Sequence, residues 1–242
     1  MRTGLFTFAK ETNKMSFTPE IINGDPLYQL IVDLVEKHRP KTILEIGSAN
    51  GMGSTQAFIE GIAKAQISDD CKMVCLEANK DRFSELLENT KNYPFIECIN
   101  ASSVPVGDYL TEEDIDEFMG GHGYEFNIKR YSSETVKGWR RDEICSIVEN
   151  NVSQSGLIVA SLKLGDSRTG WDMVLIDGSA FTGDAEYDIV HGSGVIIMDD
   201  VMDIKCWKPT CKTMADSTYR QIILNKEYRN GYAAFRRYDL CE

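Results

Sequence analysis

The chain has 242 residues, a formal net charge of −12, 42% hydrophobic residues and 26% charged residues. This length fits one large domain or two small ones, and the composition excludes disordered, collagen-like and repeat architectures. The excess of acidic residues disfavours binding to nucleic-acid phosphates and to anionic lipid surfaces. We therefore expect neither a nucleic-acid nor a membrane partner.

The first predicted helix begins at Pro26, with Asp25 as its N-cap, and Pro40 stops it. Residues 1–40 are interpreted as an N-terminal helical extension. An apolar strand is predicted at 42–46, followed by a glycine-rich loop up to residue 53. A second helix then starts at Ser54 or Thr55 and runs to about Lys64.

The alternation of strands and helices continues along the chain. Further short apolar strands are predicted at 73–76, 95–99, 173–176 and 195–198, with helices after Asn79 and around 143–150. The last two of these strands lack alternation, which is typical of parallel strands buried on both faces. Segments 219–224 and 232–237 flank a turn with Asn230 and Gly231 and predict an antiparallel hairpin.

Residues 104–141 break this rhythm with an acidic run, a glycine-rich turn and several aromatic residues. They hold too few apolar residues for a core of their own, so we interpret them as a lid-like insertion in a single domain spanning 1–242. The pattern as a whole predicts an α/β fold with an open, mostly parallel sheet and a C-terminal antiparallel edge.

Seven cysteines are present, an odd number, and no two of them form a C-x-x-C motif. We interpret them as reduced thiols in the core rather than as disulfides or a zinc site. The amino terminus lacks the apolar core of a signal peptide, and no apolar run approaches the roughly 20 residues that span a bilayer. These features predict a cytoplasmic protein.

Chemistry is expected at the carboxyl ends of the parallel strands, where ligands of open α/β sheets bind. The first strand leads into a loop with Gly47, Gly51 and Gly53, which lets the backbone approach a ligand before a helix N-terminus. Glu77 ends the second strand, where a carboxylate can accept both ribose hydroxyls. Together they indicate an adenosine-containing cofactor, the alternative being a tight turn without a ligand and a solvated carboxylate.

Residues 44–55 resemble motif I of class I S-adenosylmethionine-dependent methyltransferases. The resemblance extends over about residues 25–238 and implies a doubly wound, Rossmann-like, seven-stranded sheet with S-adenosylmethionine as cofactor. It implies that the glycine loop holds the methionine part, that Glu77 holds the ribose, and that the segment after the third strand contacts adenine. The cofactor-binding residues implied in this way are Glu45, Gly47, Ser48, Gly51, Gly53, Ser54, Glu77, Ala101 and Ser102.

Three carboxylates are predicted to meet beside this site, because Asp177 ends the fourth strand and Asp199 and Asp200 end the fifth. A hard cation such as Mg²⁺ would relieve their repulsion, whereas the alternative is that Asp199 or Asp200 caps a turn. The arrangement is similar to metal-dependent O-methyltransferases of the macrocin and catechol types. That similarity implies Mg²⁺ on the three aspartates and, for the macrocin type, a sugar hydroxyl as acceptor. The segment 178–182 departs from that pattern.

A catalytic base is harder to assign. Asp177 is one candidate, and His122 in the insertion is another, since imidazole titrates in the range that suits a general base. An exposed loop residue is the alternative for His122. His38 ends the first helix, where a cation is favoured by the helix dipole, and is interpreted as structural. His191, before the fifth strand, is expected to make a loop contact away from the site. Lys205 and Lys208, shortly after the acidic pair, could line the site, but a solvent-facing position is the default expectation for both lysines.

The leading hypothesis is therefore a methyltransferase that acts on a hydroxyl of a small molecule, of the sugar or nucleotide-sugar type. One alternative is a nicotinamide-dependent, short-chain-type oxidoreductase, although no tyrosine has a lysine four positions later. Another is a methyltransferase-like module that binds without catalysing. The sequence leaves the oligomeric state open, with a homodimer as one option.

Overall fold

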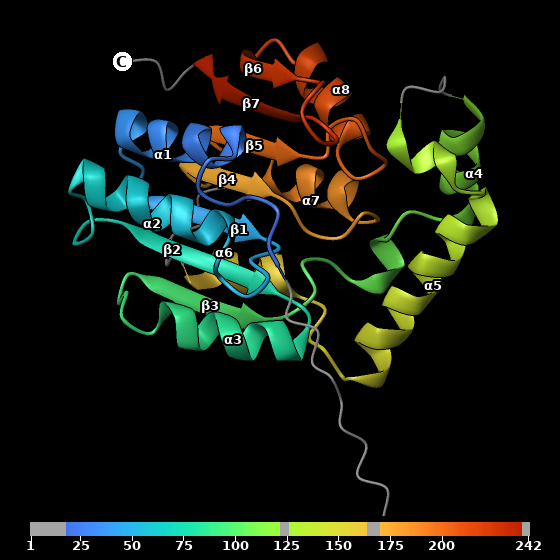
Figure 1. Cartoon of the computed structure of the whole chain (residues 1–242), viewed down its shortest axis with the longest axis horizontal. Helices are drawn as coiled ribbons and strands as arrows, with labels where there is room; N and C mark the ends of the chain where they lie inside the picture. Colours follow the sequence, from blue (N-terminus) through green and yellow to red (C-terminus); the bar gives the residue numbers. More distant parts are fainter. Residues whose placement is uncertain (1–17, 122–125, 164–169, 239–242) are drawn as a thin grey trace, which may run out of the picture.

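The structure, a computed structural model, describes residues 18–121, 126–163 and 170–238 (Figure 1). Within them, seven strands form one sheet in the order β3-β2-β1-β4-β5-β7-β6. The first five strands run parallel, and β7 lies antiparallel between β5 and β6. The predicted fold class is therefore confirmed. The strands are β1 Thr42–Ile46, β2 Lys72–Glu77, β3 Ile96–Asn100, β4 Met173–Ile176, β5 Val195–Asp199, β6 Tyr219–Asn225 and β7 Tyr232–Arg237.

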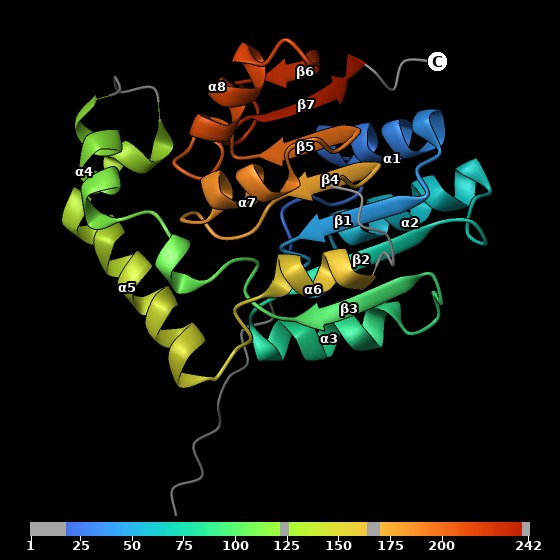
Figure 2. The ribbon, with the colours of Figure 1, turned by 180° about the vertical axis from the view of Figure 1, so that it is seen from behind.

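Helices cover both faces of the sheet, as Figures 1 and 2 show from opposite sides. One face carries α1 Pro26–His38, α2 Ser54–Ala65 and α3 Lys80–Thr90, and the other carries α6 Gly156–Lys163, α7 Gly183–Val190 and α8 Trp207–Ala215. Successive strand residues point to opposite faces, so that Ile43 packs under α1 and α2 while Leu44 packs on the other side. This two-sided burial explains why the strands read as uninterrupted apolar runs.

Two of the predicted helix starts are confirmed by their caps. The Asp25 carboxylate accepts a hydrogen bond from the backbone N–H of Leu27 at 2.7 Å, before Pro26 opens α1. The Asn79 side chain accepts hydrogen bonds from the N–H groups of Asp81 and Arg82, both at 3.0 Å. These side-chain oxygens satisfy donors that have no partner inside the helix.

The insertion is longer than predicted and forms an arm beyond the carboxyl ends of the parallel strands (Figure 2). It contains α4 Glu112–Gly121 and α5 Ser133–Glu149, with short 3-10 turns at Val106–Asp108 and Asn127–Arg130. The helix expected around 143–150 is thus only the last part of α5. Apolar residues of the arm join the core on the α7 face, and the ring of Phe126 lies 4.9 Å from that of Trp207. Its role as a lid stays a prediction.

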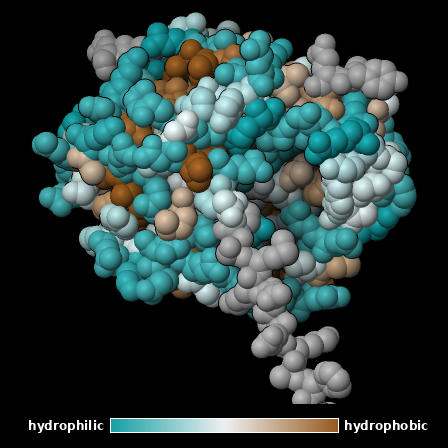
Figure 3. Space-filling view, in the orientation of Figure 1, coloured by the Kyte–Doolittle hydropathy of each residue, from teal (hydrophilic) through white to brown (hydrophobic). Residues whose placement is uncertain are grey.

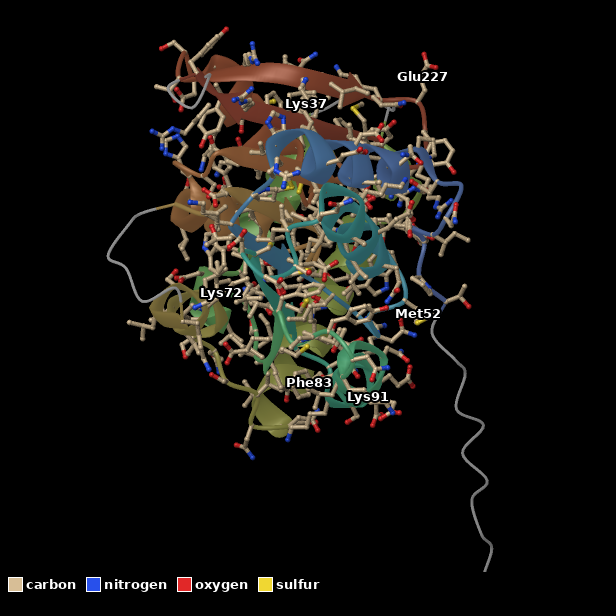
Figure 4. All side chains as sticks on the ribbon, turned by 90° about the vertical axis from the view of Figure 1, so that its left-hand side faces the viewer. Lys37, Met52, Lys72, Phe83, Lys91 and Glu227 are labelled. Carbon is tan, nitrogen blue, oxygen red and sulfur yellow. The ribbon has the colours of Figure 1, made fainter. Side chains whose placement is uncertain are left out.

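The outer surface agrees with the acidic, polar composition. The face over α1–α3 is largely hydrophilic with scattered hydrophobic residues (Figure 3). Figure 4 views the amino ends of the parallel strands, where Lys72 begins β2 and Lys37 lies near the end of α1. None of the described helices combines the length and hydrophobicity that crossing a bilayer requires. The six described cysteines are free thiols; Cys145 and Cys211 are exposed, contrary to the expected core position.

Candidate cofactor and active site

A cavity of about 570 Å³ lies at the carboxyl ends of the parallel strands, where the sequence placed the site. The loops after β1, β2, β3, β4 and β5 all contribute to its wall, and α5 and the segment before α1 close it from the sides. Its lining includes Gly47, Ala49, Gly53, Ser54, Glu77, Ala101, Ser102, Asp177, Asp199, Asp200 and Lys205, together with Glu20 and Glu143.

Gly47 is a residue of the glycine loop at which the backbone geometry requires glycine. Its φ is +89°, and a Cβ built on it would lie 2.1 Å from the carbonyl oxygen of Asp177. The backbone N–H groups of Gly47 and Ser48 both donate to the carbonyl oxygen of Leu76 at 3.0 Å. The loop is thus pressed against the ends of β2 and β4, which only glycine allows without strain.

Part of the predicted loop contact is not found. Gly47, Gly53 and Ser54 line the cavity, but Glu45, Ser48 and Gly51 do not. The Glu45 carboxylate is fully buried and accepts hydrogen bonds from the hydroxyls of Ser54 and Thr55, both at 2.7 Å. Glu45 therefore holds the first turn of α2 in place behind the cavity wall instead of facing a ligand.

Glu77 faces the cavity from the end of β2, as predicted. Its carboxylate accepts a hydrogen bond from the backbone N–H of Asn79 at 2.7 Å and is mostly buried. Burial raises the pKa of Glu77, and the hydrogen bond from Asn79 opposes that rise. Ala101 and Ser102 also line the cavity, but the Ser102 hydroxyl donates to the carbonyl oxygen of Val104 at 2.7 Å.

The three predicted aspartates do come together. Because β4 and β5 are paired neighbours, Asp177 lies across from Asp199. One carboxylate oxygen from each of Asp177, Asp199 and Asp200 lies within 4.8 Å of the others. Burial raises the pKa of Asp177 to about 8 and that of Asp199 to about 6, and the mutual repulsion of the carboxylates adds to both shifts.

Lys205 lies among these carboxylates, so the expectation that it faces solvent is wrong. Its Nζ lies 2.7 Å from Oδ1 of Asp177 and 2.6 Å from Oδ2 of Asp200, and its side chain is only 9% exposed. Burial alone would lower the pKa of this ammonium, but the surrounding carboxylates hold it well above its usual range. Lys208, by contrast, is exposed and forms an ion pair with Asp184, as a surface lysine would.

Arg229 supplies a second buried cation from the turn between β6 and β7. Its Nη1 lies 3.0 Å from Oδ2 of Asp199, its Nη2 3.2 Å from Oδ1, and its Nε 3.2 Å from Oδ2 of Asp25. The side chain is 17% exposed. This two-pronged contact fixes both oxygens of Asp199 and ties the β6–β7 turn to the start of α1.

These contacts bear directly on the implied magnesium. Mg²⁺ demands near-octahedral oxygen ligands, and an ammonium cannot share its inner sphere. Lys205 takes an oxygen each from Asp177 and Asp200, while Arg229 takes both from Asp199. The residues as arranged therefore do not fit a Mg²⁺ ion.

The arm contributes one functional group that the sequence reasoning missed. Glu143 of α5 lines the cavity, and burial raises its pKa, while nearby Ser179 and Tyr109 oppose that rise. The missed clue was its place on a predicted helix beside the insertion. Among charged lining residues, carboxylates outnumber cations: Glu20, Glu77, Glu143, Asp177, Asp199 and Asp200 against Arg82 and Lys205.

The histidines give no base within the described residues. His122 lies outside the described residues. Nε2 of His191 lies 2.7 Å from Oδ2 of Asp216, a loop contact as expected. Burial lowers the pKa of His38 to about 4, so that its imidazole is neutral at the end of α1, whereas we had expected a favourable cation there.

Neither a protein-family model nor a curated protein sequence matches the chain. Solved structures do. An O-methyltransferase from Bacillus cereus in complex with SAH is 15% identical, with 88% of this chain and 82% of that chain covered and a TM-score of 0.51. A putative caffeoyl-CoA O-methyltransferase from Staphylococcus aureus is 16% identical, with coverages of 88% and 84% and a TM-score of 0.50. A Geobacter sulfurreducens methyltransferase is 10% identical, with coverages of 90% and 81% and a TM-score of 0.50. With this strand order, the chain has the Rossmann-like fold of class I S-adenosylmethionine-dependent methyltransferases.

Proposed function

We propose that the protein is an S-adenosylmethionine-dependent methyltransferase that methylates a hydroxyl oxygen of a small molecule. The observation that carries the proposal is the single cavity wall shared by Gly47, Glu77 and Asp177 at the carboxyl ends of three adjacent strands. Gly47 lets the backbone approach a ligand closely, the Glu77 carboxylate can bind ribose hydroxyls, and the Asp177 carboxylate can lie beside the reacting group. The likeness in fold to known O-methyltransferases supports it.

The cofactor would lie across the loops after β1, β2 and β3. Gly47, Gly53 and Ser54 would face its methionine part, and Glu77 would accept hydrogen bonds from the ribose hydroxyls. The adenine ring would lie near Ala101 and Ser102. It would contact their backbone atoms, because the Ser102 hydroxyl already donates to Val104. The acidic lining also favours the positive sulfonium of the cofactor.

Bound S-adenosylmethionine supplies an electrophilic methyl group, whose bond to sulfur breaks with the electron pair left on sulfur as the acceptor oxygen forms its bond to carbon. The chain's task is to hold acceptor and methyl in line and to take the hydroxyl proton. We assign that proton to the carboxylate of Asp177, which lines the cavity. His122 remains a second candidate base.

The charge of the cavity narrows the acceptor class. The excess of carboxylates in its lining favours a neutral or cationic acceptor and opposes a phosphate or a nucleotide diphosphate. A sugar-type hydroxyl therefore fits better than a nucleotide-sugar. The magnesium assistance implied by sequence would compete with two cations, Lys205 and Arg229, that already contact Asp177, Asp199 and Asp200, so the proposed reaction contains no metal step.

The two alternatives, a nicotinamide-dependent oxidoreductase and a binding module without catalysis, are not equally well supported. Dinucleotide-binding sheets of the Rossmann type run parallel in the order 3-2-1-4-5-6, whereas β7 here is antiparallel and separates β5 from β6. This disfavours the nicotinamide-dependent oxidoreductase. A binding module without turnover would retain cofactor affinity and show no methyl transfer to any hydroxyl acceptor.

Replacing Glu77 with alanine should weaken the binding of S-adenosylhomocysteine by about 1–3 kcal/mol, because hydrogen bonds to a charged acceptor are lost. Calorimetric titration of wild type and variant measures this, with NAD as a ligand that should not bind. Asp81→Ala, an exposed position in the first turn of α3, is the matched control and should bind like wild type. Equal affinity in Glu77→Ala, with both proteins folded by thermal melting, would refute the cofactor placement.

A further inference from the structure

The carboxylate trio of Asp177, Asp199 and Asp200 carries its own cation. Three carboxylates packed within 4.8 Å would repel one another strongly in a buried site. The Lys205 ammonium lies at 2.6 to 2.7 Å from two of them, and the Arg229 guanidinium holds the third. We propose that Lys205 occupies the place of a divalent cation in this trio, so that the protein needs no metal.

The position of Lys205 is built into the fold. A Cβ on Gly183, at the start of α7, would lie 2.1 Å from the backbone carbonyl oxygen of Lys205, so the two backbones are in close contact there. The side chain is nearly buried and ends on carboxylates from two different strand ends. A lysine anchored at its backbone and at its head group is a fixed point charge, unlike a solvated surface lysine.

The ammonium and a metal ion are mutually exclusive here. A divalent cation held by this trio would have to bind the same two carboxylates, Asp177 and Asp200, that the Lys205 ammonium already contacts. Its entry would bring two positive charges against a buried ammonium, whose ion pairs among the described residues are those with Asp177 and Asp200. The trio therefore selects the lysine over the metal.

Lys205 also has a role in catalysis, which rests on the proposed methyltransferase function. An ammonium has three N–H donors, and Asp177 and Asp200 accept two of them. Lys205 also lines the cavity, so its third donor can orient the acceptor oxygen and stabilise negative charge on it. That is the task a metal ion performs in metal-assisted transfer.

Metal binding tests the central claim without any acceptor. Manganese is the probe, because it prefers the same carboxylate ligands as magnesium and the free ion has a paramagnetic resonance signal that is lost on binding. Wild type should leave that signal unchanged up to about 1 mM Mn²⁺. Lys205→Met should acquire one Mn²⁺ site with an affinity at least about tenfold higher than that of wild type. The double variant Lys205→Met with Asp177→Asn should lose this site.

Two controls sharpen the experiment. Lys208→Met removes an exposed lysine three positions away and should behave like wild type. Lys205→Gln serves as a second variant should methionine prevent folding, and Mg²⁺ should raise the melting temperature of the Lys205 variants but not that of wild type. Micromolar Mn²⁺ binding by wild type, or no gain in either Lys205 variant, would overturn the proposal. Binding of S-adenosylhomocysteine is measured separately, so failure here and failure of the proposed function are distinguishable.

Discussion

Replacing Arg229 with methionine is expected to lower the free energy of unfolding by about 3–5 kcal/mol, because a buried carboxylate then loses its partner. Both oxygens of Asp199 bind the guanidinium, at 3.0 and 3.2 Å, and the Asp199 side chain is 4% exposed. Arg229 also lies 3.2 Å from the Asp25 carboxylate, so the variant loosens the start of α1 as well. Denaturant titration at pH 8 measures the loss.

The same variant should show a defined pH dependence. Burial raises the pKa of Asp199 from 3.8 to about 6, and Arg229 opposes that rise. A carboxyl group with a raised folded-state pKa favours the folded state below its unfolded pKa, and this advantage is lost as the pH rises through the folded value. Without Arg229 the pKa of Asp199 rises further, so the destabilisation should be larger at pH 8 than at pH 5.

Two comparisons isolate the pair. Lys226→Met lies on the same turn, is exposed, and should change stability by less than about 0.5 kcal/mol. Asp199→Asn combined with Arg229→Met should cost less than Arg229→Met alone, since no charge is then left unpaired. An Arg229→Met protein as stable as wild type at pH 8 would mean that Asp199 does not depend on the guanidinium.

The parallel strands were predictable because each is a short apolar run that is buried on both faces. The crossover helix α7 was not, since its eight residues, Gly183–Val190, mix acidic and apolar side chains without a clear stripe. Topology held the missing clue. Two parallel neighbours need a long crossover connection, so the stretch between β4 and β5 had to contain a helix or an equivalent excursion.

The residues of the site, too, could be predicted only in part from the sequence. Asp177 and Asp199 could be placed together because each ends a strand, and strand ends meet at one edge of a sheet. Lys205 could not, because the path of the loop after β5 decides whether its side chain turns inward or outward. Arg229 lies 30 residues beyond Asp199, on a turn whose position depends on the antiparallel insertion of β7. Burial of such cations is a property of the assembled sheet.

Glu45 lies next to the cofactor loop as expected, but its role differs from the one predicted. Its place in the first strand pointed to the cofactor loop, yet side chains nine and ten residues later, Ser54 and Thr55, bind its carboxylate. A buried acid needs hydrogen-bond donors, and the first turn of α2 provides them. Glu45 thus shapes the loop that approaches the ligand, without lining the cavity itself.

Replacing Gly47 with alanine should be the most damaging small change in the cofactor loop. At a φ of +89° a side chain is strained, and the added Cβ would meet the Asp177 carbonyl oxygen at 2.1 Å. We expect a loss of roughly 2–4 kcal/mol in the free energy of unfolding from strain and overpacking together. Because relief requires the loop to move away from β4, affinity for S-adenosylhomocysteine should also fall, by at least about tenfold.

Gly138→Ala is the matched control for Gly47→Ala. Gly138 lies within α5, has no positive φ, and a Cβ there would meet nothing within 4 Å. Alanine should therefore stabilise the helix by up to about 1 kcal/mol and leave cofactor binding unchanged. Denaturant titration and calorimetry on both variants separate the two effects. If Gly47→Ala were as stable as wild type and bound S-adenosylhomocysteine equally well, close contact between the loop and β4 could not be what shapes the cofactor site.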